Sequence, residues 1–191
     1  MGPSDVQLTY AFAYITYALL FGGAMYGIIR TTKAFMMIPK LAEPNRYPEV
    51  VPTLVLTRGI SGLAFLAVNV INLSLAVSLG ITQEYLYDAG DLLSYVSTNQ
   101  PSNDEVALSL LVSSMLRMTG TIGLMHGCNA IGDIGHRDES VKKKANTRVF
   151  WGFICGVVLW TPEFWAELGG KYFEPLKHLS TLLKATELVS G

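Results

Sequence analysis

The sequence is poor in charged residues and in cysteine. Only 15% of its 191 residues are Asp, Glu, Lys or Arg, whereas charged residues make up about 25% of an average soluble domain. The two cysteines, Cys128 and Cys155, lie in or beside apolar segments, which argues against a small secreted disulfide scaffold. The formal net charge of −1 gives no overall attraction for nucleic acid. The composition therefore argues against an ordinary cytosolic enzyme.

Signatures of the common enzyme classes are also missing. The chain contains no G-x-x-x-x-G-K-[ST], G-x-G-x-x-G, G-x-S-x-G or H-E-x-x-H pattern. Asp133, His136 and Asp138 follow His126, but their spacing matches no usual zinc-binding pattern. We therefore expect no catalytic residues, no cofactor and no metal site.

Long apolar runs dominate what the sequence does contain. Residues 8–29 carry no charge and reach the length of about 20 residues that a helix needs to cross a bilayer. Residues 59–81 are charge-free as well, whereas Arg117 and His126 interrupt a third run. The sequence predicts an all-α polytopic membrane protein with one domain over 1–191. It is expected to be a helical bundle with about four membrane-embedded segments, at 8–29, 59–81, 106–131 and 149–165, and an amphipathic tail over 166–191.

The fourth segment and the tail allow more than one structure. The unbroken run 149–160 is too short to span, and it reaches spanning length only by continuing past Pro162 to Trp165. A re-entrant or shallow element is therefore an alternative there. After Pro162 the apolar residues recur at steps of three and four, which is the spacing of one helical face. We expect this tail helix, bent at Pro175, to lie in the headgroup region or to pack on a neighbour.

Lysine and arginine are absent from residues 82–105, whereas the loops before and after carry several. By the positive-inside rule the basic loops are cytoplasmic, so four spans leave both termini outside. For a bacterial inner-membrane protein this side is the periplasm. We interpret one basic group as a contact to anionic phospholipid at the membrane surface, with no direct binding of nucleic acid. Its members are Lys142, Lys143, Lys144 and Arg148.

Arg117 is the most informative polar residue. A charge near the centre of an apolar helix costs about 2.5 to 3.5 kcal/mol on insertion scales, and such a residue usually faces a bundle interior, a water-filled cavity or a charged partner. Arg117 could therefore contact a pore or a lipid phosphate inside an assembly. Alternatively, the span is shifted and Arg117 reaches an interface. His126 lies in the same run and is the second candidate for an intramembrane polar contact.

Glycines recur at helical spacing in the apolar segments. Because lipid gives little hydrophobic drive between helices, small residues matter there by letting two backbones approach closely. Packing within one subunit and packing between subunits both remain open. Two asparagines on one face of the second segment are expected to hydrogen-bond across to another helix. The residues assigned to helix packing are Gly120, Gly123, Gly127, Gly132, Gly152, Gly156, Asn69 and Asn72.

Two stretches of the chain carry a family resemblance. The first is Arg117-Met-Thr-Gly-Thr-Ile-Gly-Leu-Met-His-Gly with the nearby Asn129-Ala-Ile-Gly-Asp-Ile-Gly, and the second is Phe150-Trp-Gly-Phe-Ile-Cys-Gly-Val-Val-Leu-Trp. They resemble the IcmC/DotE, DotV and TraQ-like inner-membrane proteins of type IVB secretion and conjugation systems. The resemblance implies a non-enzymatic structural subunit that assembles with other membrane subunits as a homo- or hetero-oligomer.

The polar residues themselves suggest an alternative function. A small oligomeric channel or transporter subunit would use a polar path around Arg117, His126 and Asp133. Such a path needs several copies of the chain, because four thin helices enclose little water.

Overall fold

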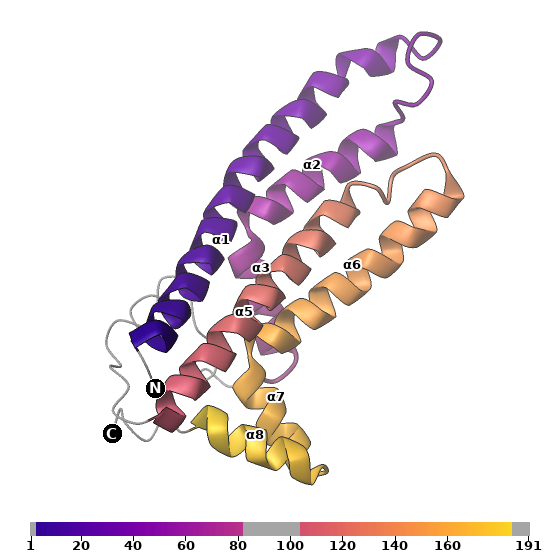
Figure 1. The fold of residues 1–191 in the computed structure, drawn as a ribbon. Helices are drawn as coiled ribbons and strands as arrows, with labels where there is room; N and C mark the ends of the chain where they lie inside the picture. The colour runs from indigo at the N-terminus through magenta and orange to yellow at the C-terminus, as the bar shows by residue number, and fades with distance from the viewer. Residues whose placement is uncertain (1–2, 82–103, 185–191) are drawn as a thin grey trace. The chain divides into compact units, whose positions relative to one another are not determined.

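The computed structural model describes residues 3–81 and 104–184, and in these ranges the chain forms helices and turns without strands (Figure 1). The predicted all-α fold is thereby confirmed. The segment 82–105, which lacks lysine and arginine, lies almost wholly outside the described residues. The helices are α1 (Pro3–Met37), the 3-10 helix η1 (Pro39–Ala42), α2 (Pro52–Leu66), α3 (Val68–Ser78), α5 (Asp104–Ile131), α6 (Glu139–Trp160), α7 (Pro162–Gly170) and α8 (Glu174–Lys184).

Among the residues that the structure describes, two helices are long and apolar enough to cross a membrane. They provide the candidate spans Gln7–Ala42 and Leu108–Ile131, which contain most of the predicted segments 8–29 and 106–131. Two further pairs, α2 with α3 and α6 with α7, pass the same test only if each bent pair is one span. Helices suited to a membrane are therefore confirmed, and their number lies between two and four.

The second predicted segment is not one straight helix. The chain bends by 83° between α2 and α3, at Ala67, whose φ of −102° and ψ of 15° leave the helical region. No proline or glycine stands at this position, so the sequence carries no marker of the break. The helix also starts earlier than predicted, because Pro52 occupies a first-turn position where its missing N–H costs no hydrogen bond.

The fourth predicted segment is bent as well. The chain turns by 85° between α6 and α7, at Thr161, and Pro162 starts the new helix because it cannot donate the N–H that α6 would need to continue. Helix α6 begins at Glu139, well before the predicted start at residue 149. Asp138 caps this start: its carbonyl accepts the N–H of Lys142, and its side chain accepts the N–H of Ser140.

The tail forms two helices within the described residues, α7 and α8, which pack against each other. The chain turns between them at residues 171–173, ahead of Pro175 rather than at it. Pro175 lies in the first turn of α8, where proline is compatible with a helix. Gly170 lies against the backbone of α8, since a Cβ there would lie 3.0 Å from Lys177 Cα.

The chain divides into two compact units. Unit 1 comprises Met1–Leu19, Leu73–Thr121 and Val157–Gly191, and unit 2 comprises Leu20–Asn72 and Ile122–Gly156. The buried apolar side chains of unit 1 include Leu110, Val157, Trp160, Ala166 and Leu183. Those of unit 2 include Leu54, Val55, Phe65, Leu124 and Cys128.

Candidate functional site: a buried ion pair and its surroundings

A polar stripe runs along the part of α5 that belongs to unit 1. Its members are four residues apart, so they share one face of the helix, and all are buried: Ser109, Ser113, Arg117 and Thr121. The Ser109 hydroxyl donates a hydrogen bond to the carbonyl of Leu183 in α8, over 3.2 Å. The Thr121 hydroxyl donates to the Arg117 carbonyl within α5. The stripe therefore contacts the tail helix α8 as well as its own backbone.

At the centre of the stripe Arg117 forms an ion pair with Glu163 of α7. Arg117 Nη2 lies 2.7 Å from Glu163 Oε1, and the two side chains are 2% and 10% exposed. The Ser113 hydroxyl donates to the same carboxylate oxygen over 2.6 Å. Two donors from successive turns of α5 thus meet one acceptor on α7.

The bend at Thr161 positions Glu163 for this contact. Because α7 starts at Pro162, Glu163 falls in its first turn, where a negative charge is favoured by the helix dipole. The Thr161 hydroxyl and the Thr161 backbone N–H both donate to the Val157 carbonyl in the last turn of α6. The bend at Thr161 therefore places the Glu163 carboxylate beside Arg117, with no loop between α6 and α7.

This arrangement neutralises the charge of Arg117 inside the chain. Burying two charges costs several kcal/mol per ion, and the attraction within the pair and the hydrogen bond from Ser113 act against that cost. The second carboxylate oxygen, Glu163 Oε2, is buried without a hydrogen-bond partner among the described residues. Sequence reasoning did not include Glu163 among the site residues. The signal was present, because one acidic residue in the fourth apolar segment and one basic residue in the third each require a partner.

A second polar stripe lies on α2 in unit 2. Its hydroxyls donate to one carbonyl in the last turn of α5, where helix carbonyls lack partners within the helix, and to two carbonyls in the turn that follows α5. The donors again lie four residues apart. Thr53 donates to the Gly135 carbonyl over 3.2 Å, Thr57 to that of Gly132 over 3.3 Å, and Ser61 to that of Cys128 over 2.6 Å.

Arg30 also contacts the end of α5 in unit 2. Its guanidinium donates to the Asn129 carbonyl over 3.1 Å and to the Asn129 side-chain oxygen, and it lies 5.9 Å from the centre of the Tyr26 ring. Gly132 leaves room for the guanidinium, because a Cβ there would collide with it. A cation at the C-terminal end of a helix is stabilised by the helix dipole. In the sequence Arg30 stands out only as the first basic residue after the apolar run 8–29.

The predicted packing glycines lie at close helix contacts within the chain. In unit 2, a Cβ on Gly123 would meet the backbone of Gly152 and Gly156 on α6, and Gly127 contacts Phe153. Gly120 is buried on the unit 1 part of α5. Asn72 is buried and its side-chain oxygen has no hydrogen-bond partner among the described residues, while Asn69 is partly buried.

The other predicted polar residues are spread over the chain. His126 is exposed on α5 and Asp133 is partly exposed after it; both belong to unit 2, whereas Arg117 belongs to unit 1. Lys142, Lys143, Lys144 and Arg148 are exposed on α6. The described residues contain no cluster of three His, Cys, Asp or Glu side chains able to hold a metal ion.

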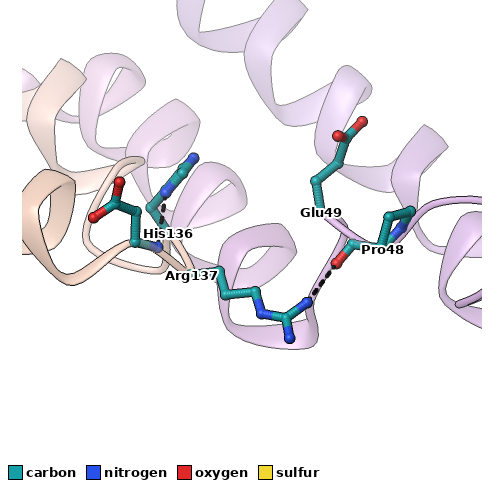
Figure 2. Close-up of a pocket in the computed structure, with 5 residues that line it drawn as sticks. Pro48, Glu49, His136 and Arg137 are labelled. Carbon is teal, nitrogen blue, oxygen red and sulfur yellow. Dashed lines mark hydrogen bonds between the residues drawn. The ribbon is translucent and has the colours of Figure 1, made fainter.

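An open hollow of about 400 Å³ lies at the loops of unit 2 (Figure 2). It is lined by Pro48, Glu49, His136, Arg137 and Asp138. Arg137 Nη1 points at the Pro48 carbonyl, 3.4 Å away, and the Asp138 N–H donates to His136 Nδ1 over 3.1 Å. Because acidic and basic side chains are mixed in this lining, the hollow favours neither an anionic nor a cationic ligand.

The cap at Asp138 has a predictable dependence on pH. Hydrogen bonds from the Ser140 side chain and backbone hold the pKa of Asp138 below its ordinary value of 3.8. A carboxylate whose pKa falls on folding stabilises the fold above the unfolded pKa, and this contribution is lost as the pH drops through the folded pKa. Asp138→Ala should therefore lower the thermal midpoint in detergent at neutral pH, and the difference from wild type should shrink below pH 3.8.

Asp138→Asn is the matched control, because asparagine keeps the capping oxygen but does not titrate. The difference in thermal midpoint between Asp138→Asn and Asp138→Ala should be the same at neutral pH and below pH 3.8. A difference between wild type and Asp138→Ala that does not change with pH would contradict the role of the carboxylate.

The class of the protein follows from the fold and the site. The described chain is all-α, two to four of its helices are long and apolar enough to span a membrane, and its most buried charges pair internally. No protein-family model matches the chain, and neither a curated protein nor a solved structure shows significant similarity to it. The functional proposal therefore depends on the residues themselves.

Proposed function

We propose that the protein is a non-enzymatic structural subunit of a multiprotein complex in the bacterial inner membrane, with both termini in the periplasm. The observation that carries this proposal is the buried Arg117–Glu163 pair, with 2.7 Å between Nη2 and Oε1. The two charged side chains bind each other and so hold α7 against α5. A charge pair used in this way supports a role in assembly rather than in chemistry.

Large exposed apolar side chains on α1 support the contact with membrane subunits and lipids. In the unit 2 part of α1, the side chains of Phe21, Met25, Ile29, Phe35 and Met36 are each at least half exposed. In water a surface of this kind would favour aggregation or binding, whereas in a membrane it faces lipid or neighbouring helices. Basic residues on α6 supply a complementary surface for anionic headgroups.

The type of complex is proposed from the resemblance of residues 117–135 and 150–160 to the type IVB secretion and conjugation proteins. The test is extraction from native membranes in a mild detergent, affinity purification of the tagged chain, and mass spectrometry of the bound proteins and lipids. We expect a large complex that contains secretion or conjugation components. Recovery as a small homo-oligomer alone would contradict the proposal and favour the channel alternative, and recovery as a monomer would contradict both.

The purification needs two matched variants. Arg117→Ala should reduce recovery of the complex, because it removes the partner of Glu163 on α7. Arg137→Ala changes an exposed arginine in a loop and should leave recovery unchanged. If the complex is recovered equally with both variants, Arg117 is not needed for its assembly.

A further inference from the structure

The turn between α7 and α8 exposes an apolar cluster in unit 1. Tyr172 is 81% exposed and Phe173 66%, and Leu168 and Leu176 beside them are 38% and 37% exposed. The rest of the hairpin is anchored, since α7 packs on α8 and Leu183 at the far end of α8 is 1% exposed. The cluster is therefore a defined surface on an ordered hairpin.

The side chains around this cluster are charged. Lys171 and Lys177 are exposed on either side of it, and one exposed acid, Glu174, lies between them. Aromatic rings next to lysines are typical of the boundary between headgroups and acyl chains, where the ring meets lipid and the ammonium meets phosphate.

Contacts along α5 locate two points of the hairpin in unit 1, the end of α8 and the start of α7. The apolar span of α5 starts at Leu108, and Ser109, directly after it, binds the Leu183 carbonyl of α8. Ser113 and Arg117, which bind Glu163 of α7, lie about 6 and 12 Å beyond Ser109 at the helical rise of 1.5 Å per residue. Helix α8 thus ends beside the start of the apolar span of α5. Helix α7 begins beside the part of that span that contains Ser113 and Arg117.

We propose that the α7–α8 hairpin is an interfacial membrane element and that phospholipids of the bilayer surface cover its exposed cluster. The hairpin lies on the side of the membrane where α5 begins. The bend of 85° after α6 fits this location, because it turns α7 away from the direction of α6 instead of continuing a span. The inference rests on the membrane location in the proposed function.

Depth measurements on spin labels test the inference. Cys128→Ala and Cys155→Ser remove the two cysteines, and single cysteines are then introduced by Tyr172→Cys, Met115→Cys or His178→Cys. Met115 is 54% exposed on the apolar part of α5, and His178 is exposed on α8. The labelled full chain is reconstituted in vesicles of phosphatidylcholine and phosphatidylglycerol, and its accessibility to oxygen and to a water-soluble nickel chelate is measured.

We expect three different depths. The Met115 label should be accessible to oxygen and protected from nickel, and the His178 label should be accessible to nickel. The Tyr172 label should take an intermediate position, with nickel accessibility severalfold below that of His178 and clear accessibility to oxygen.

Three results would overturn the inference. If the Tyr172 label is as accessible to nickel as the His178 label while Met115 remains protected, the cluster faces water although the chain is embedded. If the Tyr172 label is protected from both reagents, protein rather than lipid covers it. If the Met115 label is itself fully accessible to nickel, the membrane location fails, and the proposed function fails with it.

Discussion

Arg117→Ala is expected to destabilise the folded protein by about 3 to 5 kcal/mol, the usual cost of removing one partner from a buried ion pair. The variant leaves the Glu163 carboxylate buried, with the Ser113 hydroxyl as its remaining donor among the described residues. The measurement is an unfolding titration with sodium dodecyl sulfate in mixed micelles, followed by circular dichroism. Arg137→Ala, at an exposed position, should change the stability by less than about 0.5 kcal/mol.

The double variant Arg117→Met/Glu163→Met removes the whole ion pair, whereas Arg117→Ala leaves one buried charge without its partner. Replacing both partners of a buried pair by apolar residues of similar size is often neutral or stabilising. The double variant should therefore be clearly more stable than Arg117→Ala. If Arg117→Ala is as stable as wild type, the ion pair does not hold α7 against α5.

Gly152→Ala is expected to separate α5 from α6 in unit 2. A Cβ at Gly152 would lie 2.7 Å from Cα and N of Gly127 and 2.9 Å from the Gly123 carbonyl oxygen. These are backbone atoms, so no side-chain rotation relieves the collision and the helices must move apart. Added atoms in a closely packed contact cost about 1 to 3 kcal/mol. The same detergent titration measures this loss.

Gly22→Ala is the control for this prediction, since a Cβ at Gly22 meets nothing within 4 Å. It lies within α1, where alanine is favoured over glycine by about 0.5 to 1 kcal/mol. We expect unchanged or slightly higher stability. Equal effects of Gly22→Ala and Gly152→Ala would mean that the close approach of α5 and α6 is not required.

Apolar length predicted the helices of the chain better than it predicted their ends. Segments 8–29 and 106–131 lie inside α1 and α5, because a long run that is almost wholly apolar has few alternatives to a helix. The start of α6 was missed, since its first turns carry Lys142 to Lys144, which look like a loop in a search for apolar residues. Lysine is nevertheless a good helix former, and the cap at Asp138 starts the helix there.

Tertiary contacts account for what the sequence did not reveal. Arg117 was expected to need a partner or an interface, but nothing in its neighbourhood along the chain identifies Glu163, which is reached only after the bend at Thr161. The break at Ala67 carries no proline or glycine, so it reflects packing rather than local propensity. Glycine spacing predicted close helix contacts, and Gly123, Gly127, Gly152 and Gly156 lie at contacts between α5 and α6 within the chain.

The early start of α6 changes how its basic residues can act on a membrane. Consecutive residues on a helix are separated by 100° of rotation, so Lys142, Lys143 and Lys144 point in three directions around the axis instead of forming one charged side. All three are exposed, so in the proposed membrane location these lysines would resist movement of α6 along its axis into the bilayer. Because the lysines point to several sides, they favour no particular rotation of α6 about its axis. The glycine contacts with α5 determine which face of α6 is turned toward α5.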